Sequence, residues 1–422
     1  MLTLQVLRQD TAKVKERLAH KHFADPSIVD LILSIDEQRK KVQLEVDNNL
    51  AKVNSASKEI GGLMAKGQKE EAETKKQEVA SLKLALQPLT EQLSELEKKM
   101  QDELVKLPNL PAEIVPAGKH AQDNLTVKEG GVKPTLPADA QPHWELIKKY
   151  DLVDFETGAK ITGSGFPLYK GKGAKLQRSL IQYFLDVNTG AGYTEYLPPL
   201  MVNEASAYGT GQLPDKEGQM YHMQVDNFYM IPTSEVPVTN IYRDEIVKEA
   251  DLPIKMTAFS PCFRREAGSF GSDVRGLNRV HQFDKVEIVQ IVHPEKSYQT
   301  LDEMVAHVEK LLQSLELPYR ILRLCGGDMS FASALTYDFE VYSAAQQKWL
   351  EVSSVSNFES FQANRLKLRF KDEKGKPQLA HTLNGSSLAL PRIVAALLEN
   401  NQTATGINLP KALHSYFGAA SI

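Results

Sequence analysis

The chain has 422 residues, 42 % of them hydrophobic, and a formal net charge of −4. This length exceeds one ordinary core and predicts two domains, and the hydrophobic content argues against a disordered chain. With so small a net charge, any nucleic-acid binding depends on local basic patches. The two cysteines, Cys262 and Cys325, have no partner at metal-ligand spacing, so we interpret them as core thiols.

The N-terminus lacks the apolar core of a signal peptide, and no apolar run has membrane-spanning length. We therefore expect a soluble, cytoplasmic protein without a membrane partner.

The first hundred residues carry apolar side chains at two heptad-spaced positions, in two successive runs. The repeats include Ile28, Ile35, Val42, Val79, Leu86 and Leu93. A break around Gly61-Gly62 and residues 66–68 predicts an antiparallel helical hairpin over about residues 27–106. Pro88 predicts a kink in its second helix. A homodimeric coiled coil and a solvated structural helix pair remain alternatives for this pattern.

Residues 108–143 contain six prolines and the pair Gly130-Gly131, which predicts a connector with little regular structure. The domain boundary is therefore placed here, between a helical arm domain at 1–107 and a second domain at 144–422. In the second domain a helix from about residue 174 to 189 precedes strands interspersed with helices, without a regular βαβ period. This pattern predicts an α+β domain built on an antiparallel sheet flanked by helices.

The densest set of charged and aromatic side chains lies on two predicted strands joined by a Gly-rich loop. Because residues two apart on a strand share a face, Arg264 is expected beside Glu266, and Arg279 beside Phe283 and Glu287. Guanidinium groups bind phosphates, a ring stacks on a base, and carboxylates hold a metal or an amine. The pattern predicts a nucleotide site, and the alternative is an exposed hairpin laced with salt bridges.

Two further clusters favour the same interpretation. An extended segment would place Thr233 and Glu235 on one face, where a hydroxyl and a carboxylate can receive a small ammonium group. A strand and turn are predicted to enter a helix that carries Arg392 about two turns in, and free N–H groups at such a helix start favour anions. Helix capping is the alternative role for Ser386 and Ser387.

Three common nucleotide and nucleophile motifs are absent from the sequence. It contains no G-x-x-x-x-G-K-[ST] phosphate loop, no G-x-G-x-x-G after a strand, and no G-x-S-x-G turn. The predicted nucleotide site is therefore of another construction.

These segments, taken in order, resemble the three motifs of the class II aminoacyl-tRNA synthetases, and specifically the bacterial-type seryl-tRNA synthetase family. The long helix and strand that end at Pro199 resemble motif 1, residues 263–287 resemble motif 2, and residues 384–392 resemble motif 3. Segments typical of the seryl family are matched at 210–214, 233–235, 280–287 and 351–357. The resemblance spans essentially the whole chain, including the arm.

The resemblance implies residues for each ligand. The serine set is Thr233, Ser234, Glu235, Glu287, Thr382, Asn384 and Ser386. The ATP set is Arg264, Arg265, Glu266, Arg279, Val280, Phe283, Glu351, Val352, Ser353, Ser354 and Arg392. Within these sets the resemblance assigns catalysis to Arg264, Glu351 and Arg392, and Mg²⁺ to Glu351 and Ser354. Glu287 would accept a hydrogen bond from the serine hydroxyl, Phe283 would stack on adenine, and Arg392 would lie at the terminal phosphate.

The implied activity is ATP-dependent formation of seryl adenylate and transfer of serine to the 3′ end of serine tRNA, without a covalent enzyme intermediate. The resemblance also implies a homodimer with Pro199 at its interface, and an arm that holds the long variable arm of serine tRNA. Whether selenocysteine tRNA is also charged stays open. Two alternatives are a relative that loads a carrier protein, which would lack the arm, and a coiled-coil scaffold whose synthetase domain has lost its ATP-gripping residues.

Overall fold

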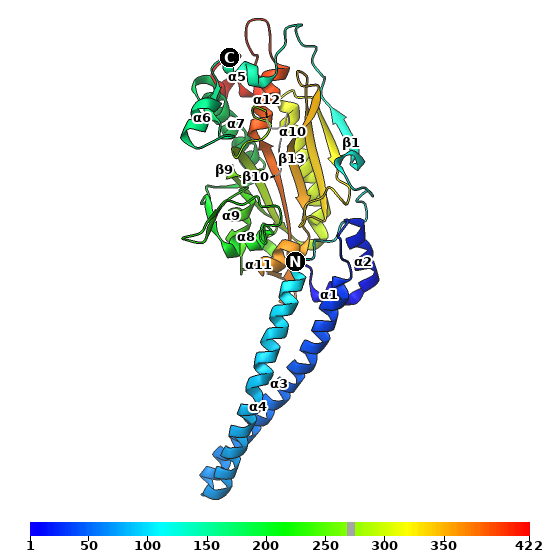
Figure 1. Cartoon of the computed structure of the whole chain (residues 1–422), viewed down its shortest axis with the longest axis vertical. Coiled ribbons are helices and arrows are strands. Elements are labelled where there is room, and N and C mark those ends of the chain that lie inside the picture. Colours follow the sequence, from blue (N-terminus) through cyan, green and yellow to red (C-terminus); the bar gives the residue numbers. More distant parts are fainter. Residues whose placement is uncertain (268–274) are drawn as a thin grey trace. The chain divides into compact units, whose positions relative to one another are not determined.

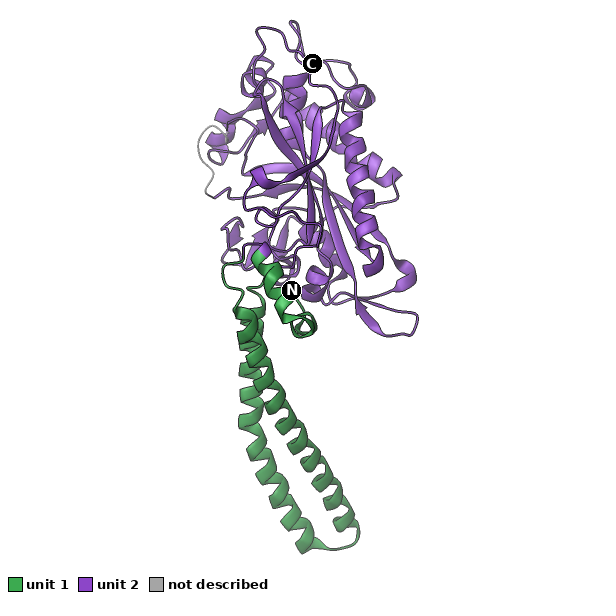
Figure 2. Cartoon of the chain, turned by 90° about the vertical axis from the view of Figure 1, so that its right-hand side faces the viewer, with its two compact units in different colours: residues 1–19, 23–108 green, residues 20–22, 109–422 purple. Residues whose placement is uncertain are grey.

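The computed structural model describes residues 1–267 and 275–422, and it divides into two compact units (Figure 2). Unit 1 comprises Met1–Ala19 and Phe23–Pro108, and unit 2 comprises His20–His22 and Asn109–Ile422. The predicted Gly-rich loop falls on residues 268–274, outside the described residues. Within the described ranges, no helix is both long and apolar enough to cross a membrane.

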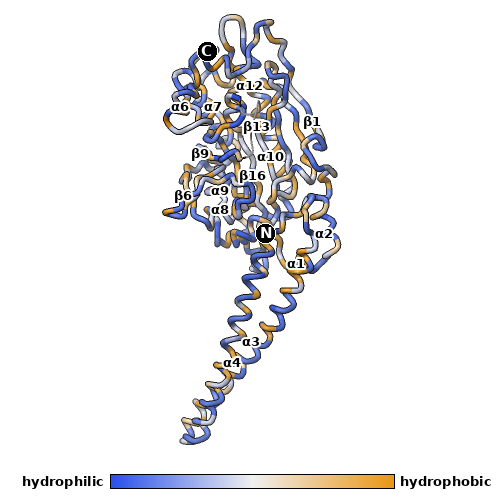
Figure 3. Tube along the Cα trace, viewed as in Figure 1, coloured by the Kyte–Doolittle hydropathy of each residue, from blue (hydrophilic) through white to orange (hydrophobic). Residues whose placement is uncertain are grey.

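Unit 1 is helical and contains the predicted hairpin (Figure 1). Its helices are α1 (Leu4–Gln9), α2 (Thr11–His20), α3 (Ile28–Ala65) and α4 (Lys69–Leu104). Helices α3 and α4 pack along each other, with Val42, Val46 and Leu96 in one buried cluster and Val53 and Val79 in another. Apolar residues recur along two otherwise hydrophilic helices (Figure 3). The heptad seam is therefore filled within one chain, as the hairpin interpretation predicted.

The turn of the hairpin spans fewer residues than predicted. Gly61 and Gly62 lie inside α3, and the chain reverses at residues 66–68, where Gly67 has a φ of 76°. A glycine inside a helix costs about 1 kcal/mol relative to alanine, and both of these glycines are exposed. Helix α4 continues through Pro88, and the kink expected there stays a prediction.

A buried carboxylate fixes the base of α3. Asp36 accepts hydrogen bonds from Arg8 of α1 and from Arg39 one turn along α3, and it also lies 3.3 Å from Lys40 Nζ. Burial alone would raise the pKa of Asp36, but the hydrogen bonds from Arg8, Arg39 and Lys40 hold it below its ordinary value. This cluster ties α1 to α3, and it gives Arg39, which interrupts the apolar seam, a structural role.

The described part of unit 2 is built on an eight-stranded sheet. In spatial order the strands are β1 (Leu125–Gly130), β11 (Tyr319–Arg323), β12 (Leu335–Ser343), β13 (Lys348–Asn357), β16 (His381–Ala389), β10 (Gln282–Val292), β9 (Ile254–Phe263) and β4 (Thr194–Tyr196). All neighbours are antiparallel except β4 and β9, which are parallel. In the centre, Glu287 of β10 pairs with Ser386 of β16 and with Ala258 of β9. The predicted antiparallel α+β domain is confirmed.

Smaller sheets and helices complete unit 2. The further strands are β15 (Pro377–Leu379), β14 (Arg369–Lys371), β8 (Ile246–Lys248), β2 (Val153–Asp154), β3 (Leu168–Tyr169), β5 (Met201–Asn203), β7 (Phe228–Met230) and β6 (His222–Met223). The helices are α5 (His143–Lys149), α6 (Phe155–Ile161), α7 (Gly171–Gly190), α8 (Glu204–Thr210), α9 (Glu235–Thr239), α10 (Ser297–Ser314), α11 (Ser360–Leu366), α12 (Leu390–Asn400) and α13 (His414–Phe417).

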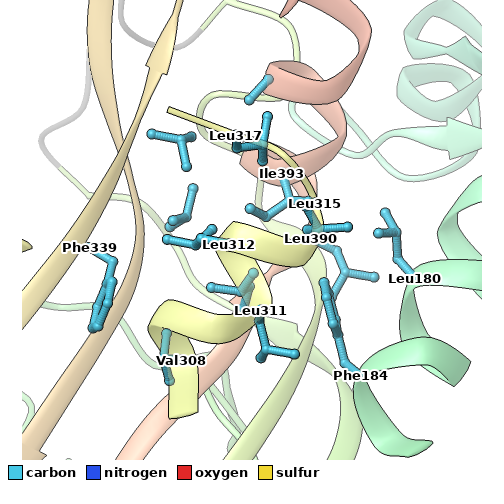
Figure 4. Close-up of a cluster of buried hydrophobic side chains, with 14 of the residues drawn as sticks. Leu180, Phe184, Val308, Leu311, Leu312, Leu315, Leu317, Phe339, Leu390 and Ile393 are labelled. Carbon is cyan, nitrogen blue, oxygen red and sulfur yellow. The ribbon is translucent and has the colours of Figure 1, made fainter. Parts of the chain in front are cut away.

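The main core lies between the central strands and helices α7, α10 and α12 (Figure 4). Phe184 of α7, Leu312 of α10 and Ile393 of α12 meet there, and Phe339 of β12 adds an aromatic side chain. Because one face of the sheet is covered by these helices, its alternate side chains are free to line a site on the other face.

The predicted connector is more ordered than expected. Residues 125–130 within it form β1, which pairs antiparallel with β11 and so becomes the edge strand of the main sheet. The backbone N–H and C=O groups of this stretch can form hydrogen bonds with an open sheet edge. Strand β1 lies between the prolines of the connector, so no proline interrupts it. Proline content therefore predicted the irregular flanks and missed the strand.

We predict that Asp36→Asn lowers the free energy of unfolding of the arm by about 1–3 kcal/mol at pH 7, because charge-assisted hydrogen bonds contribute about that much. The folded-state pKa of Asp36 is depressed, so this stabilisation is full above the unfolded-state pKa of about 4 and is lost as pH falls through the folded value. Denaturation followed by far-ultraviolet circular dichroism at pH 7 and at lower pH measures the effect.

Asp30→Asn is the matched control on the same helix. Asp30 pairs with Lys15 at 2.6 Å, but its side chain is 60 % exposed, and such pairs contribute at most about 1 kcal/mol. Equal losses in the two variants would contradict the role given to Asp36.

Candidate active site

A cavity of about 620 Å³ opens on the face of the sheet opposite the helical core. Successive side chains of strand β10 point alternately into the cavity and into the core. Phe283, Lys285 and Glu287 line the cavity, whereas Val286 and Ile288 belong to the core beneath it. The other walls come from β13, β16, the start of α12 and residues 210–220.

One end of the cavity, which we call the acidic end, is formed by Thr233, Glu235 and Glu287. Thr233 donates its hydroxyl to Glu287 Oε2 at 3.2 Å and accepts from the backbone N–H of Glu235 at 3.1 Å. The ammonium of Lys285 lies 2.5 Å from the same Glu287 oxygen, and both side chains are under 10 % exposed. Lys285 therefore balances one of two buried carboxylates.

Glu235 is the less neutralised carboxylate of the acidic end. Burial and then the nearby charge of Glu287 raise its pKa to about 7, while Gln362 and Lys285 act in the opposite direction. The Gln362 side-chain N–H donates to Glu235 Oε1 at 2.6 Å. A ligand cation placed between these carboxylates would favour the ionised form of Glu235, so the acidic end suits a small ammonium group.

A second part of the cavity wall, which we call the arginine end, is formed by Arg264, Phe283 and Arg392. The guanidinium of Arg264 lies 5.2 Å from the Phe283 ring centroid and donates from Nε to Pro232 O at 3.3 Å. Beside it, Arg279 and Glu266 form an ion pair at 3.0 Å. Two cationic side chains next to a flat ring suit a phosphorylated base.

Arg392 is held by two backbone carbonyls. Its Nε donates to Asn278 O at 3.0 Å, and Nη1 donates to Glu351 O at 2.7 Å. It lies in the first turn of α12, whose amino end carries unpaired N–H groups and a positive dipole. An anionic group is therefore favoured beside it.

Glu351 and Ser354 project hard oxygen atoms from β13 into the cavity. The Glu351 side chain is 51 % exposed. Behind them lies Asp338 of β12, which accepts a hydrogen bond from Ser354. The pKa of Asp338 is raised, mainly by burial and to a lesser extent by the charge of Glu351. Oxygen donors of this kind suit Mg²⁺. Within residues 1–267 and 275–422, no group of three or more acidic, histidine or cysteine side chains is arranged to hold a metal.

Strand alternation does not explain how the motif 2 residues converge. Strand β9 ends at Phe263 and β10 begins at Gln282, so Arg264, Glu266 and Arg279 lie beyond the strand ends. Glu266 has a positive φ of 48°, which turns the chain. The expected shared faces were therefore wrong for these three residues, although Arg279 and Glu266 do meet as an ion pair.

The backbone of the two smaller clusters also differs from the prediction. Residues 232–234 form bends and a turn, and Glu235 begins α9, so Thr233 and Glu235 are brought together by a local hydrogen bond and not by an extended strand. Strand β16 runs directly into α12 without a turn, which puts Arg392 in the first helical turn. Ser386 and Ser387 lie in the strand, so neither caps the helix.

Three predicted site residues do not line the cavity. Ser234 is buried with its hydroxyl 2.6 Å from Ser260 Oγ, and Thr382 donates to Gln362 Oε1 at 2.7 Å. Arg265 is exposed. The other predicted residues line the cavity, and they are Thr233, Glu235, Arg264, Glu266, Arg279, Val280, Phe283, Glu287, Glu351, Val352, Ser353, Ser354, Asn384, Ser386 and Arg392.

Sequence reasoning missed two side chains that support the acidic end. Lys285 shares the strand parity of Phe283 and Glu287, so the alternation used for those two residues could have found it. Gln362 of α11 donates to Glu235 and accepts from Thr382. No local signal in the sequence marks Gln362, because its contacts depend on how α11 packs beside β16.

Comparisons with known proteins agree across the chain. Residues 1–111 match the family described as the seryl-tRNA synthetase N-terminal domain, and residues 221–401 match the tRNA synthetase class II core domain (G, H, P, S and T). The serine–tRNA ligase of Salinibacter ruber is 52 % identical over 100 % of this chain and 99 % of that protein. The chain belongs to the seryl-tRNA synthetase family.

Further relatives of the seryl-tRNA synthetase family agree with this assignment. The serine–tRNA ligase of Neisseria meningitidis serogroup B is 47 % identical over 100 % of this chain and 99 % of that protein. The crystal structure of the Pyrococcus horikoshii seryl-tRNA synthetase, which is complexed with ATP, superposes with a TM-score of 0.91. It is 32 % identical and covers 100 % of this chain and 99 % of its own.

We predict that Lys285→Met lowers the free energy of unfolding by about 3 kcal/mol, because it leaves Glu287 buried without its cation. Adding Glu287→Gln removes the buried charge that has lost its cation, and this should recover most of the lost free energy of unfolding. Chemical denaturation of the single and double variants measures both effects. A double variant as unstable as Lys285→Met would argue against ion pairing as the source of the loss.

Proposed function

We propose that this chain is an ATP-dependent serine–tRNA ligase. The observation that carries the proposal is a single cavity with buried carboxylates at its acidic end and Arg264, Phe283 and Arg392 at its arginine end. Such a cavity can hold an amino acid against a nucleotide. Membership of the seryl-tRNA synthetase family supports serine as the amino acid and tRNA as the acceptor.

At the acidic end, Glu235 and Thr233 receive the serine ammonium group and Glu287 accepts from the serine hydroxyl. The proposed serine set also includes Asn384 and Ser386 from β16, with Ser234 and Thr382 supporting the wall from behind. Burial and the nearby charge of Glu287 raise the pKa of Glu235, and a bound ammonium group lowers it again because it stabilises the charged form. Serine is selected because a substrate without a hydroxyl cannot donate a hydrogen bond to Glu287, whose other partners are Thr233 and Lys285.

At the arginine end, Phe283 stacks on the adenine ring and Arg264 binds the α-phosphate. Arg392 binds the terminal phosphate beside the amino end of α12. The remaining ATP contacts that we assign come from the neighbouring walls, namely Glu266, Arg279, Val280, Glu351, Val352, Ser353 and Ser354. Arg265, which is exposed outside the cavity, is assigned to the ATP set on the family resemblance alone.

Glu351 and Ser354 would hold Mg²⁺, with phosphate and water oxygens completing its coordination. The paired oxygen donors on β13, with the buried carboxylate of Asp338 behind Ser354, fit this ion. When bound, Mg²⁺ neutralises charge on the phosphates of ATP.

The proposed reaction has two displacements. A carboxylate oxygen of serine attacks the α-phosphorus of ATP, and the bond to the bridging oxygen breaks to release pyrophosphate and leave seryl adenylate. A hydroxyl of the terminal ribose of tRNA then attacks the seryl carbonyl and releases AMP. Arg264 stabilises the developing phosphate charge while the two ends of the cavity align the reactants, so positioning and electrostatics supply the catalysis.

Unit 1 is the proposed tRNA-binding element. We assign residues 1–107 to a tRNA-binding arm, 108–143 to a connector and 144–422 to the class II catalytic domain. The arm carries exposed lysines near the hairpin turn, including Lys58, Lys66 and Lys69, and phosphate contacts from such side chains hold RNA by shape more than by sequence. Serine tRNA is the proposed partner, with selenocysteine tRNA as a further candidate substrate.

We also infer a cytoplasmic homodimer. Leu197 and Met201, which flank Pro198-Pro199 in the segment that resembles motif 1, are 86 % and 50 % exposed. Apolar side chains around a rigid dipeptide suit a two-fold interface, because each copy presents the same patch. Sedimentation at micromolar concentration distinguishes this dimer from a monomer. The cytoplasmic location follows from the proposed role in translation.

The direct test is serine-dependent exchange of pyrophosphate into ATP, followed by charging of purified serine tRNA. We predict that Glu287→Gln reduces serine activation by about 2–3 kcal/mol, since a charge-assisted hydrogen bond is lost. Alanine activation, which never used that bond, should fall much less, so the serine-to-alanine preference should shrink. An unchanged preference together with a lower melting temperature would assign Glu287 a structural role only.

The outcome also separates the alternative functions. Activation of serine without charging of tRNA would favour a relative that loads a carrier protein. A folded protein without serine activation would favour a scaffold.

A second prediction concerns the arm. Replacing residues 26–107 by a short linker should leave seryl-adenylate formation largely intact and abolish tRNA charging, because the hairpin packs on its own seam. Pyrophosphate exchange and aminoacylation measured on the same preparation separate the two steps. Charging at comparable efficiency would rule out the hairpin as the tRNA-binding element.

A further inference from the structure

A buried polar network lies outside the cavity wall and ends on it. His143, the first residue of α5, is fully buried, as is Glu399 of α12. Both the backbone N–H and Nδ1 of His143 contact Glu399 Oε1, at 2.8 and 2.7 Å. On the other side of the ring, Nε2 lies 2.8 Å from the backbone N–H of Leu277, which lines the cavity.

This geometry fixes the protonation of the imidazole. A backbone N–H can only donate, so Nε2 of His143 must accept from Leu277 and carries no proton. The ring proton is therefore on Nδ1, where it is donated to the Glu399 carboxylate. Glu399 thus orients the ring and selects the tautomer that can hold Leu277.

A second branch of the network reaches the next residue of the same loop. Gln346 donates from Nε2 to Glu399 Oε1 at 2.8 Å and accepts from Asn278 Nδ2 at 3.0 Å. Two consecutive cavity residues, Leu277 and Asn278, are therefore tied to one carboxylate. Among the described residues, no donor contacts the buried Oδ1 of Asn278, which leaves an acceptor in the wall of the cavity.

The loop backbone in turn positions a side chain at the arginine end. Asn278 O accepts from Arg392 Nε at 3.0 Å, so moving the loop backbone moves the guanidinium that we assign to ATP. The approach of loop to imidazole is close. A Cβ added at Gly276 would lie 2.3 Å from His143 Nε2, and Gly276 has a positive φ of 61°. Only glycine allows this contact without a shift.

We propose that Glu399 and His143 are a positioning pair for the ATP end of the site. Through Leu277 and Asn278 the pair sets the backbone that holds Arg392, without touching substrate itself. This inference rests on the proposed function and adds to it two residues from outside the three class II motifs.

The test uses two replacements of His143 that each keep one nitrogen position. His143→Asn retains a donor near Nδ1 for Glu399 but does not reach Leu277, whereas His143→Gln offers an oxygen near the Nε2 position that can accept from Leu277. In serine-dependent pyrophosphate exchange, His143→Asn should raise the KM for ATP about tenfold, the effect of one lost hydrogen bond, and change the KM for serine much less. His143→Gln should restore most of the ATP affinity.

Ser343→Ala is the matched control. Ser343 donates to the other carboxylate oxygen of Glu399, Oε2, and accepts from the backbone N–H of Gln346, so its loss disturbs the same carboxylate without removing a direct contact to Leu277 or Asn278. Melting temperatures of all variants measure the structural cost. Equal destabilisation of His143→Asn and Ser343→Ala, with the ATP KM of His143→Asn within twofold of wild type, would overturn the proposal.

If His143→Asn does not fold, Gln346→Ala removes the second link to the loop and should raise the ATP KM in the same direction. An unchanged ATP KM in folded Gln346→Ala would then overturn the proposal. Wild-type protein without serine-dependent exchange would instead refute the proposed function. In that case ATP binding by calorimetry to wild type and variants still tests the positioning pair.

Discussion

Two carboxylates buried side by side in one cavity wall impose the main constraint on unit 2. Glu235 and Glu287 are both under 10 % exposed, and bringing two negative charges out of water is costly unless cations and donors surround them. This cost is offset by Lys285 on the same strand as Glu287, by Thr233 just before α9 and by Gln362 on α11. Burial and the charge of Glu287 still raise the pKa of Glu235, so the acidic end is not fully neutralised by these partners.

The central sheet keeps this polar site apart from the core. Each middle strand sends one set of side chains into the packing of α7, α10 and α12 and the other set into the cavity. Hydrogen bonds also reach the strands from the core side of the sheet. Ser387 of β16 donates to Asn188 of α7 at 3.1 Å. Asn188 in turn donates to Thr257, whose hydroxyl donates to the backbone carbonyl of Glu287. Glu287 is therefore held from both faces of the sheet.

The arginine end is held mainly by backbone groups. Arg264 and Arg392 donate to main-chain carbonyls, so their positions depend on loop geometry more than on neighbouring side chains. Side chains positioned this way are sensitive to whatever fixes the loop. This is why the buried pair His143 and Glu399, far apart in sequence, matters for a site that neither residue lines.

Sequence by itself determined the features that repeat locally. Heptad spacing predicted the helical hairpin, the irregular succession of strands and helices predicted the antiparallel α+β domain, and strand parity placed Phe283 and Glu287 on one face. Tertiary structure decided what depends on distant contacts. Arg264, Glu266 and Arg279 converge beyond their strand ends, and Arg392 enters from the first turn of α12. Lys285 was within reach of the sequence pattern, but Gln362 and the pair of His143 and Glu399 were not, because their hydrogen bonds join segments that only the folded sheet brings together.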